Sequence, residues 1–363
     1  MNLFQLGWNE YHEANLKATL GNGPGKAGYR PGRVLEVHPT SCRALTESGE
    51  ETAFYQGRLR KSAQGEAINP AVGDWAVLEP GETGGTVISH ILPRKSRISR
   101  NSAGTETKEQ VLASNVDIAF VVGSLNRELN YNRLERYLVA VYDGGSLPVI
   151  ILNKRDLCSD ADDQVAALER RMPGVAVHAV SAVTGEGMEA INGYLGEGKT
   201  FVFLGSSGVG KSTIINRLLG GGIIETKDIS PYKDRGRHTT TSREIHLLDG
   251  GGILIDSPGL RELQIWEGGE GISQAFRDIE DLSGHCRFSD CRHMEEPGCA
   301  VRSAVEEGSL SPERLRSYHK ILREASFHQR RQNVRLRIEE ARRWKSISKS
   351  IRHFDKSRRY SAE

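Results

Sequence analysis

Cysteine is scarce in this chain, with five among 363 residues, and Cys42 and Cys158 stand apart from the other three. This spacing argues against the disulfide framework of a secreted protein and favours a reducing cytoplasm. Long apolar runs are missing too, since none approaches the ~18–20 residues that a membrane-spanning helix needs. The Met1-Asn-Leu-Phe start does not resemble a signal peptide. We therefore expect a cytoplasmic protein with no membrane partner.

Net charge is close to zero, at +2, but it is unevenly distributed. Residues 313–363 hold 16 Lys/Arg and six Asp/Glu, a net of +10, which leaves −8 on residues 1–312. A basic tail on an acidic body favours nucleic acid or another anionic surface as a partner. The sequence has no internal repeat, and at roughly 150 residues per domain its length predicts two or three domains.

A glycine-rich loop is the first strong motif. Residues 205–213 read GSSGVGKST and fit the phosphate-binding pattern G-x-x-x-x-G-K-[ST]. An apolar run precedes the loop and a helical stretch follows it, as the motif requires. The glycines let backbone N–H groups approach phosphates, and Lys211 brings a point charge to the β/γ oxygens. The loop residues expected to contact nucleotide are Gly205, Ser206, Ser207, Gly208, Val209, Gly210, Lys211, Ser212 and Thr213.

Two motifs that read a guanine base lie before this loop rather than after it. Asn153-Lys154-Arg155-Asp156 fits the signature N-K-x-D, and Ser181-Ala182 fits a second base-side loop. Asp156 offers two acceptor oxygens to the N1–H and N2–H₂ donors of guanine, and adenine would leave that carboxylate poorly paired. The base-side residues expected to contact GTP are Asn153, Lys154, Arg155, Asp156, Ser181 and Ala182.

A D-x-x-G motif, Asp256-Ser-Pro-Gly259, follows the phosphate loop after an apolar run. The order along the chain is therefore base-reading first and phosphate-reading second. Each motif comes at the end of a predicted strand, where ligands of open α/β sheets bind. The sequence thus predicts an α/β fold, a circularly permuted GTPase that hydrolyses GTP.

Residues 230–242 are polar and turn-rich, as expected of a switch loop that orders around Mg²⁺ and the γ-phosphate. We assign the magnesium to Ser212, Asp256 and Thr240, with Thr239 as the competitor of Thr240. Each of these threonines also has the alternative interpretation of an exposed strand residue.

Hydrolysis needs a group that positions water, and the usual one is missing. Leu260 stands where Ras-like enzymes carry a glutamine, so slow intrinsic hydrolysis is predicted. The Gly259 N–H is expected to sense the γ-phosphate. His238, beside the switch threonines, is the local candidate for catalysis, and its interpretation as a solvated loop histidine stays open.

Five short β-like runs with turn signals between them occupy residues 33–92. This pattern suits a small barrel such as an OB-fold, a class that often binds oligonucleotides. Basic residues in and after this region, among them Arg58, Lys61 and Arg94, would supply positive charge. A scaffold whose basic residues are merely solvated explains the pattern equally well.

The other three cysteines gather with a histidine in one short stretch, as Cys286-x₄-Cys291-x-His293-x₅-Cys299. This Cys₃His set is typical of a closed structural zinc site, so we expect one Zn²⁺ per chain. His285 is rejected as a ligand because His293 lies between the cysteines. The alternative is a set of unconnected thiols or a redox pair.

After this cluster, Ser311 and Pro312 are an N-cap and a first residue that predict a helix. The basic tail beyond it carries the apolar residues Trp344 and Ile347. These anchors favour folding on a phosphate-rich surface over a tail that stays solvated.

Taken together, these features resemble the RsgA family, the ribosome small-subunit-dependent GTPase A. Other segments that carry the resemblance are Gly7-Trp8-Asn9, Val72–Trp75, Ser99-Arg100, Glu109–Leu112, Leu125–Arg127, Gly236–Thr240, Leu260–Glu262 and Trp344–Lys349. Ser257 departs from the family's usual threonine. The resemblance implies a factor in late maturation of the small (30S) ribosomal subunit, which binds 16S rRNA and is stimulated by the subunit to hydrolyse GTP.

The expected organisation has five parts. They are an N-terminal extension (1–29), an OB-fold barrel (30–98), a permuted GTPase domain (99–268), a helical zinc-binding domain (269–325) and a basic tail (326–363). We expect a monomer. Two alternatives are a regulatory GTPase that acts on a protein partner without using its tail for RNA, and a zinc- and RNA-binding module with a vestigial nucleotide site. The intact Lys211, Ser212 and Asp256 argue against the second.

Overall fold

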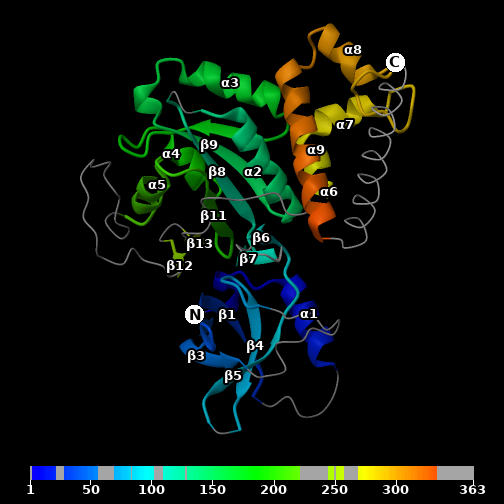
Figure 1. The fold of residues 1–363 in the computed structure, drawn as a ribbon. Helices are drawn as coiled ribbons and strands as arrows, with labels where there is room; N and C mark the ends of the chain where they lie inside the picture. The colour runs from blue at the N-terminus through cyan, green and yellow to red at the C-terminus, as the bar shows by residue number, and fades with distance from the viewer. Residues whose placement is uncertain are drawn as a thin grey trace, which may run out of the picture.

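The computed structural model describes residues 2–21, 28–55, 69–82, 84–101, 109–126, 129–220, 244–248, 251–256 and 269–332. Figure 1 shows a β-barrel at the bottom, a sheet flanked by helices above it, and a group of C-terminal helices beside the sheet. In these ranges no helix has both the length and the apolar character to cross a membrane.

The chain begins with a short 3-10 helix, η1 (Leu3–Leu6), and a helix α1 (Glu10–Leu20). Asn9 caps α1 by accepting a hydrogen bond from the Tyr11 N–H, and Gly21 ends it. Trp8, between the two helices, packs edge-on against Trp75 of the barrel, with ring centroids 4.8 Å apart. The extension therefore lies on the barrel and shares a small apolar cluster with it.

The barrel is closed by five strands in the order β1-β2-β3-β5-β4. They are β1 (Arg30–Val37), β2 (Ser41–Thr46), β3 (Gly49–Tyr55), β4 (Trp75–Pro80) and β5 (Thr86–Ile91). Strand β1 pairs with both β2 and β4, which closes the ring. Alternate side chains fill the interior, as the burial along β2 shows. The predicted OB-type barrel is confirmed.

The central sheet has six strands in the order β10-β9-β8-β11-β13-β12. They are β8 (Ile118–Ser124), β9 (Leu147–Asn153), β10 (Ala176–Ala179), β11 (Thr200–Leu204), β12 (Glu244–Leu247) and β13 (Ile253–Asp256). All neighbours are parallel except β12 and β13. The phosphate-loop strand β11 lies inside the sheet, between β8 and β13. The strands that carry the base motifs, β9 and β10, precede β11 in the chain. This is the permuted order that the motifs predict.

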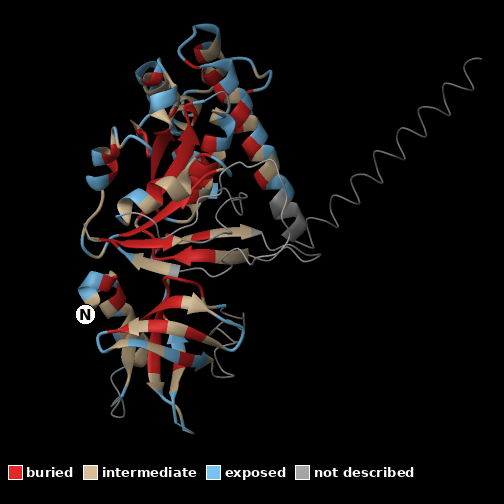
Figure 2. Ribbon diagram, turned by 90° about the vertical axis from the view of Figure 1, so that its left-hand side faces the viewer, coloured by how far each residue is buried: buried red, intermediate tan, exposed pale blue. Residues whose placement is uncertain are grey.

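Helices cover both faces of this sheet. On one face lie α2 (Tyr131–Asp143) and α3 (Ala161–Arg171), and on the other lie α4 (Met188–Asn192) and α5 (Lys211–Leu218). Successive strand residues alternate between two cores: Val121 packs with the first pair of helices, whereas Phe120 packs with the second. The strands are buried on both faces, as the buried arrows in Figure 2 show.

The C-terminal helices are α6 (Gly269–Ala275), α7 (Arg277–Ser283), α8 (Ala300–Glu306) and α9 (Pro312–Gln332). Ser311 caps α9 as predicted, because its Oγ accepts from the Arg314 N–H at 3.1 Å. Phe276 and Ile321 belong to the same apolar core as α2 and the adjoining sheet face. The C-terminal helices are thus packed against α2 rather than forming a core of their own.

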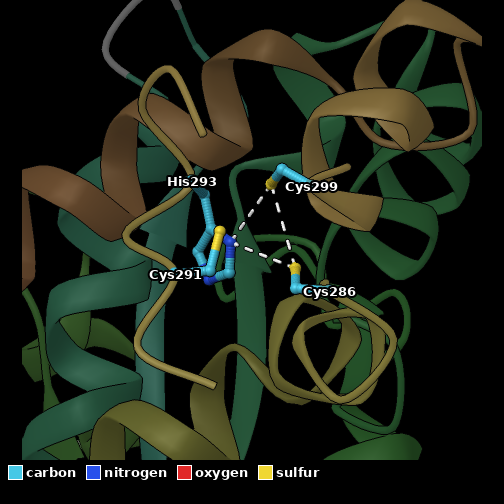
Figure 3. A group of neighbouring side chains, drawn as sticks. All are labelled: Cys286, Cys291, His293 and Cys299. Carbon is cyan, nitrogen blue, oxygen red and sulfur yellow. Dashed lines mark hydrogen bonds between the residues drawn. The ribbon is translucent and has the colours of Figure 1, made fainter. Parts of the chain in front are cut away.

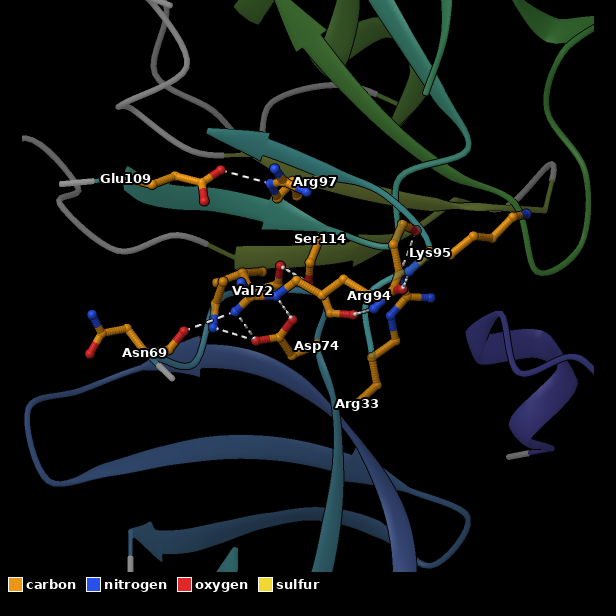
Figure 4. A network of polar contacts seen from close by, with 12 residues as sticks. Arg33, Asn69, Val72, Asp74, Arg94, Lys95, Arg97, Glu109 and Ser114 are labelled. Carbon is orange, nitrogen blue, oxygen red and sulfur yellow. Dashed lines mark hydrogen bonds and ion pairs between the residues drawn. The ribbon is translucent and has the colours of Figure 1, made fainter. Parts of the chain in front are cut away.

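A polar network joins the barrel to the sheet (Figure 4). The buried Asp74 carboxylate accepts hydrogen bonds from Nε and Nη2 of Arg94, at 2.7 and 2.8 Å. The neighbouring Gly73 has φ +90°, and a Cβ there would collide with the Ser114 carbonyl oxygen. Buried Arg33 donates to Thr200 Oγ1 at 2.9 Å, at the start of β11. These contacts give the Val72–Trp75 segment a structural role at the junction.

A two-stranded ribbon, β6 (Arg97–Asn101) and β7 (Glu109–Ser114), links the two parts. Its strands pair with each other, and the Ser114 N–H donates to the Val72 carbonyl at 2.9 Å. The barrel strands end at Ile91, so the predicted boundary at residue 98 falls within β6.

Candidate nucleotide site and metal centre

The glycine-rich loop leaves the carboxyl end of β11 and enters the N-terminus of α5, as its sequence predicts. The Lys211 Nζ donates to the carbonyl oxygens of Gly205 and Ser206, at 2.7 and 2.6 Å. This ammonium therefore lies inside the curve of the loop, beside its first two residues. Ser212 and Thr213 follow in the first turn of α5, whose N-terminus favours an anion.

Asn153 connects the base motifs to this loop. Its Nδ2 donates to the Val209 carbonyl at 2.9 Å, and its Oδ1 accepts from the Ala182 N–H at 3.0 Å. The side chain is buried, so both hydrogen bonds are shielded from water. Gly210 has φ +96°, and a Cβ there would collide with the Asn153 amide. One side chain thus joins three loops that lie far apart in the sequence.

Asp156 and Ser181 meet on the base side. The Ser181 hydroxyl donates to Asp156 Oδ1 at 2.5 Å and accepts from the Thr184 N–H at 3.1 Å. The Asp156 side chain is otherwise exposed, while Ser181 is fully buried. The hydroxyl holds one carboxylate oxygen, which fixes the orientation of the exposed group.

The side chain of Arg155 pairs with two carboxylates. It donates to Glu186 Oε1 at 2.6 Å and to Asp162 Oδ1 at 2.7 Å. The preceding Lys154 has φ +69°, the left-handed conformation that turns the chain out of β9. The side chain of Arg155 therefore braces the base loops, and any GTP contact from this position would come from the backbone.

Of the predicted magnesium ligands, Ser212 and Asp256 lie in the described part of the chain. Asp256 ends β13, which lies beside β11 with Ile255 opposite Val202. Asp256 therefore lies at the same end of the parallel strands, the carboxyl end, as the phosphate loop. His238, Thr239, Thr240, Gly259 and Leu260 lie outside the described residues.

One neighbour of the phosphate loop was not found from the sequence. The Arg133 Nη1, from the first turn of α2, donates to the Ser206 Oγ at 2.6 Å. Arg133 belongs to no motif and precedes Ser206 by 73 residues. No local sequence pattern predicts such a contact, because the contact depends on how α2 packs on the sheet.

The four predicted metal ligands converge after α7 and before α8 (Figure 3). The ligand atoms of Cys286, Cys291, His293 and Cys299 all lie within 4.8 Å of one another. Cys286 Sγ is 3.9 Å from Cys299 Sγ, and His293 Nδ1 is 3.6 Å from Cys286 Sγ and 3.4 Å from Cys299 Sγ. A tetrahedral zinc ion requires about 3.8 Å between sulfurs and about 3.6 Å between sulfur and nitrogen. The donor set fits zinc.

The surroundings of this cluster hold it in shape. Desolvation on burial lowers the pKa of His293, which favours the neutral imidazole that binds metals. Backbone N–H groups, led by its own, hold the pKa of Glu296 at about 2, and that carboxylate organises the loop 292–296. His285 is exposed and faces the Asp281 carbonyl, outside the cluster, as predicted.

Comparisons with known proteins agree with this geometry. The sequence profile named RsgA GTPase matches residues 91–266. A protein of Methanosarcina acetivorans named small ribosomal subunit biogenesis GTPase RsgA is 40% identical over 351 residues, which cover 96% of this chain and 92% of that protein. A protein of the same name from Opitutus terrae is also 40% identical, with 96% of both chains covered.

Two solved structures are similar as well. YjeQ from Thermotoga maritima has a TM-score of 0.62 and 27% identity, and covers 82% of this chain and 98% of its own. YloQ, described as a circularly permuted GTPase, has a TM-score of 0.58 and 26% identity, and covers 84% of this chain and 98% of its own. With relatives this similar over nearly its whole length, the chain belongs to the RsgA GTPase family.

Proposed function

We propose that this chain is a GTPase that acts in the biogenesis of the small (30S) ribosomal subunit and hydrolyses GTP to GDP with stimulation by that subunit. The observation that carries the GTP site is the Asn153 side chain, which joins the N-K-x-D loop to the Ser181-Ala182 loop and to the phosphate loop. The subunit as target rests on the names of the relatives.

In this proposal the phosphates lie along residues 205–213, and Lys211 turns from the loop carbonyls to the β/γ oxygens. The guanine base lies against Asp156, with Ala182 closing the pocket. Ser212, Asp256 and Thr240 would hold Mg²⁺, since a carboxylate and hydroxyls are the hard oxygen donors that this ion prefers. Bound there, the ion would neutralise charge on the β- and γ-phosphates. The Gly259 N–H would contact the γ-phosphate, and His238 would act in catalysis there.

We further propose one structural Zn²⁺ per chain, held by Cys286, Cys291, His293 and Cys299. The partner surface is 16S rRNA, contacted by the basic tail and by the barrel. The protein would act as a monomer in the cytoplasm, where small subunits mature. The five domain boundaries given above remain part of this proposal.

The subunit decides between this function and a regulatory GTPase that acts on a protein. We expect GTP turnover to rise by at least about tenfold when purified small subunits are added, because Leu260 leaves water positioning incomplete in the free enzyme. Phosphate release, measured with small subunits, large subunits or neither, checks this. Equal turnover in all three conditions would contradict the proposal.

The structure also indicates where to cut the basic tail. Residues 313–332 belong to α9, and Arg314 there is buried, so removing residues 313–363 would damage the fold. Deleting residues 333–363 instead should weaken binding to the subunit and reduce its salt dependence, because phosphate contacts release counterions. Binding of both chains at several salt concentrations measures this. A deletion that leaves affinity and salt slope unchanged would favour a protein partner.

Guanine selectivity should depend on Asp156. Asp156→Asn replaces an acceptor oxygen by a donor and places it against the guanine donors, which weakens GTP and favours xanthosine nucleotides. Titrations with GTP and xanthosine triphosphate compare the two proteins. Asp163→Asn, in an exposed carboxylate of α3, is the matched control and should keep the GTP preference. An unchanged preference in Asp156→Asn would remove this residue from its role.

A further inference from the structure

The phosphate loop has a positively charged neighbour that its own motif does not contain. Arg133 reaches from α2 to the Ser206 hydroxyl, with 2.6 Å between Nη1 and Oγ. Its side chain is exposed, and no carboxylate contacts it among the described residues. The next two charged residues of α2 do have ionic partners, since Glu135 pairs with Arg171 and Arg136 with Glu324.

The loop contacts show which end of the nucleotide this arginine faces. The Lys211 Nζ donates hydrogen bonds to the carbonyls of Gly205 and Ser206. The first two loop residues therefore lie beside the ammonium group that would bind the β/γ-phosphate oxygens. The other end of the loop, Val209 and Gly210, contacts Asn153 of the base motif. Ser206 is therefore on the terminal-phosphate side of the loop.

The helix that carries Arg133 is firmly placed. Asn130 caps α2 by accepting from the Arg133 N–H at 3.0 Å, and the adjoining Leu134 and Leu138 are buried in the core. The exposed end of the arginine side chain extends from this fixed backbone to Ser206. A guanidinium gains more from a phosphate than from a neutral hydroxyl, because charge-assisted hydrogen bonds are stronger and the fork matches phosphate oxygens.

We propose that Arg133 binds the terminal phosphate of GTP from within the same chain and stabilises the charge that develops there during hydrolysis. The proposal rests on the nucleotide placement given above. In the reaction, water attacks the γ-phosphorus and the bond from that phosphorus to the β–γ bridging oxygen breaks. The bridging oxygen keeps the electron pair as part of GDP, and the two water protons leave with the released phosphate or pass to solvent. Arg133 transfers no proton; it leaves the Ser206 hydroxyl and donates to γ-phosphate oxygens.

The test compares nucleotides that differ in the γ-phosphate. Arg133→Ala should lower subunit-stimulated GTP turnover by on the order of 100-fold or more, as removal of a transition-state donor does. It should weaken a non-hydrolysable GTP analogue while GDP affinity stays unchanged, because GDP has no γ-phosphate. Arg133→Lys should restore part of the turnover, since it keeps the charge and loses the fork. Arg170→Ala, in an exposed arginine of α3, should behave as wild type.

Two results would overturn the inference. Wild-type turnover in Arg133→Ala would show that Arg133 makes no γ-phosphate contact that matters for hydrolysis. A parallel loss of GDP and GTP-analogue affinity would show that Arg133 only shapes the loop through Ser206. The binding comparison needs no ribosomal subunit, so it tests Arg133 even if subunit stimulation, and with it the proposed function, fails.

Discussion

Protein stripped of zinc is expected to lose the fold of residues 286–310 while it still binds GDP. Four donors hold this segment, and the loop from Cys286 to Cys299 has mostly exposed residues. The free energy that a structural zinc contributes to such small modules is about 10–16 kcal/mol at neutral pH. Removing the zinc should therefore unfold this segment. Hydrogen exchange of the segment, with and without a chelator, measures the loss.

GDP binding should survive because the affected helices lie on the other side of the sheet. Cys299 and Val301 belong to the core shared with α2, whereas Ile214 of α5, directly after the phosphate loop, belongs to the opposite core. Metal analysis should give about one zinc per chain in the wild type, and Cys291→Ser should lose it. Cys158→Ser and His285→Ala are matched controls that should retain zinc. Full occupancy in Cys291→Ser would show that the ligand assignment is wrong.

The second large effect is expected from Glu135, a fully buried carboxylate of α2. Its Oε1 accepts from Arg171 Nε at 2.8 Å and from Arg314 Nη1 at 2.9 Å, and its Oε2 accepts from Ser317. Arg314, 2% exposed, also binds Asp278 through two donors at 2.8 and 3.1 Å. This network ties α2 and α3 to α7 and α9.

Glu135→Gln should lower the free energy of unfolding by about 3–5 kcal/mol, because it leaves the buried Arg314 and the largely buried Arg171 short of a compensating charge. Urea unfolding of the zinc-loaded protein measures the change in the free energy of unfolding. Hydrogen exchange of α9 then shows whether that helix is affected. Arg316→Ala removes an exposed arginine from α9 and should change stability by no more than about 0.5 kcal/mol. Equal losses in the two variants would contradict a structural role for the Glu135 network.

Features that depend on near neighbours in the chain were predictable from the sequence. The phosphate loop needs glycine and lysine at fixed spacing between a strand and a helix, and it is found there. The strands of the barrel follow from short β-like runs, and the start of α9 follows from Ser311 and Pro312. The Cys₃His cluster spans 14 residues, so its convergence needs little more than a compact loop. Even the permutation follows from motif order alone.

Contacts across the chain were decided only by the tertiary structure. The position of Arg133 beside Ser206 depends on how α2 packs on the sheet, over 73 residues of separation. The Glu135–Arg314 pair joins residues 179 apart, and no motif marks either one. The sequence suggested a zinc module attached to a separate GTPase domain, whereas the two share one apolar core. Spacing specifies local geometry because few backbone conformations satisfy it, but a buried pair between distant elements exists only once those elements have packed.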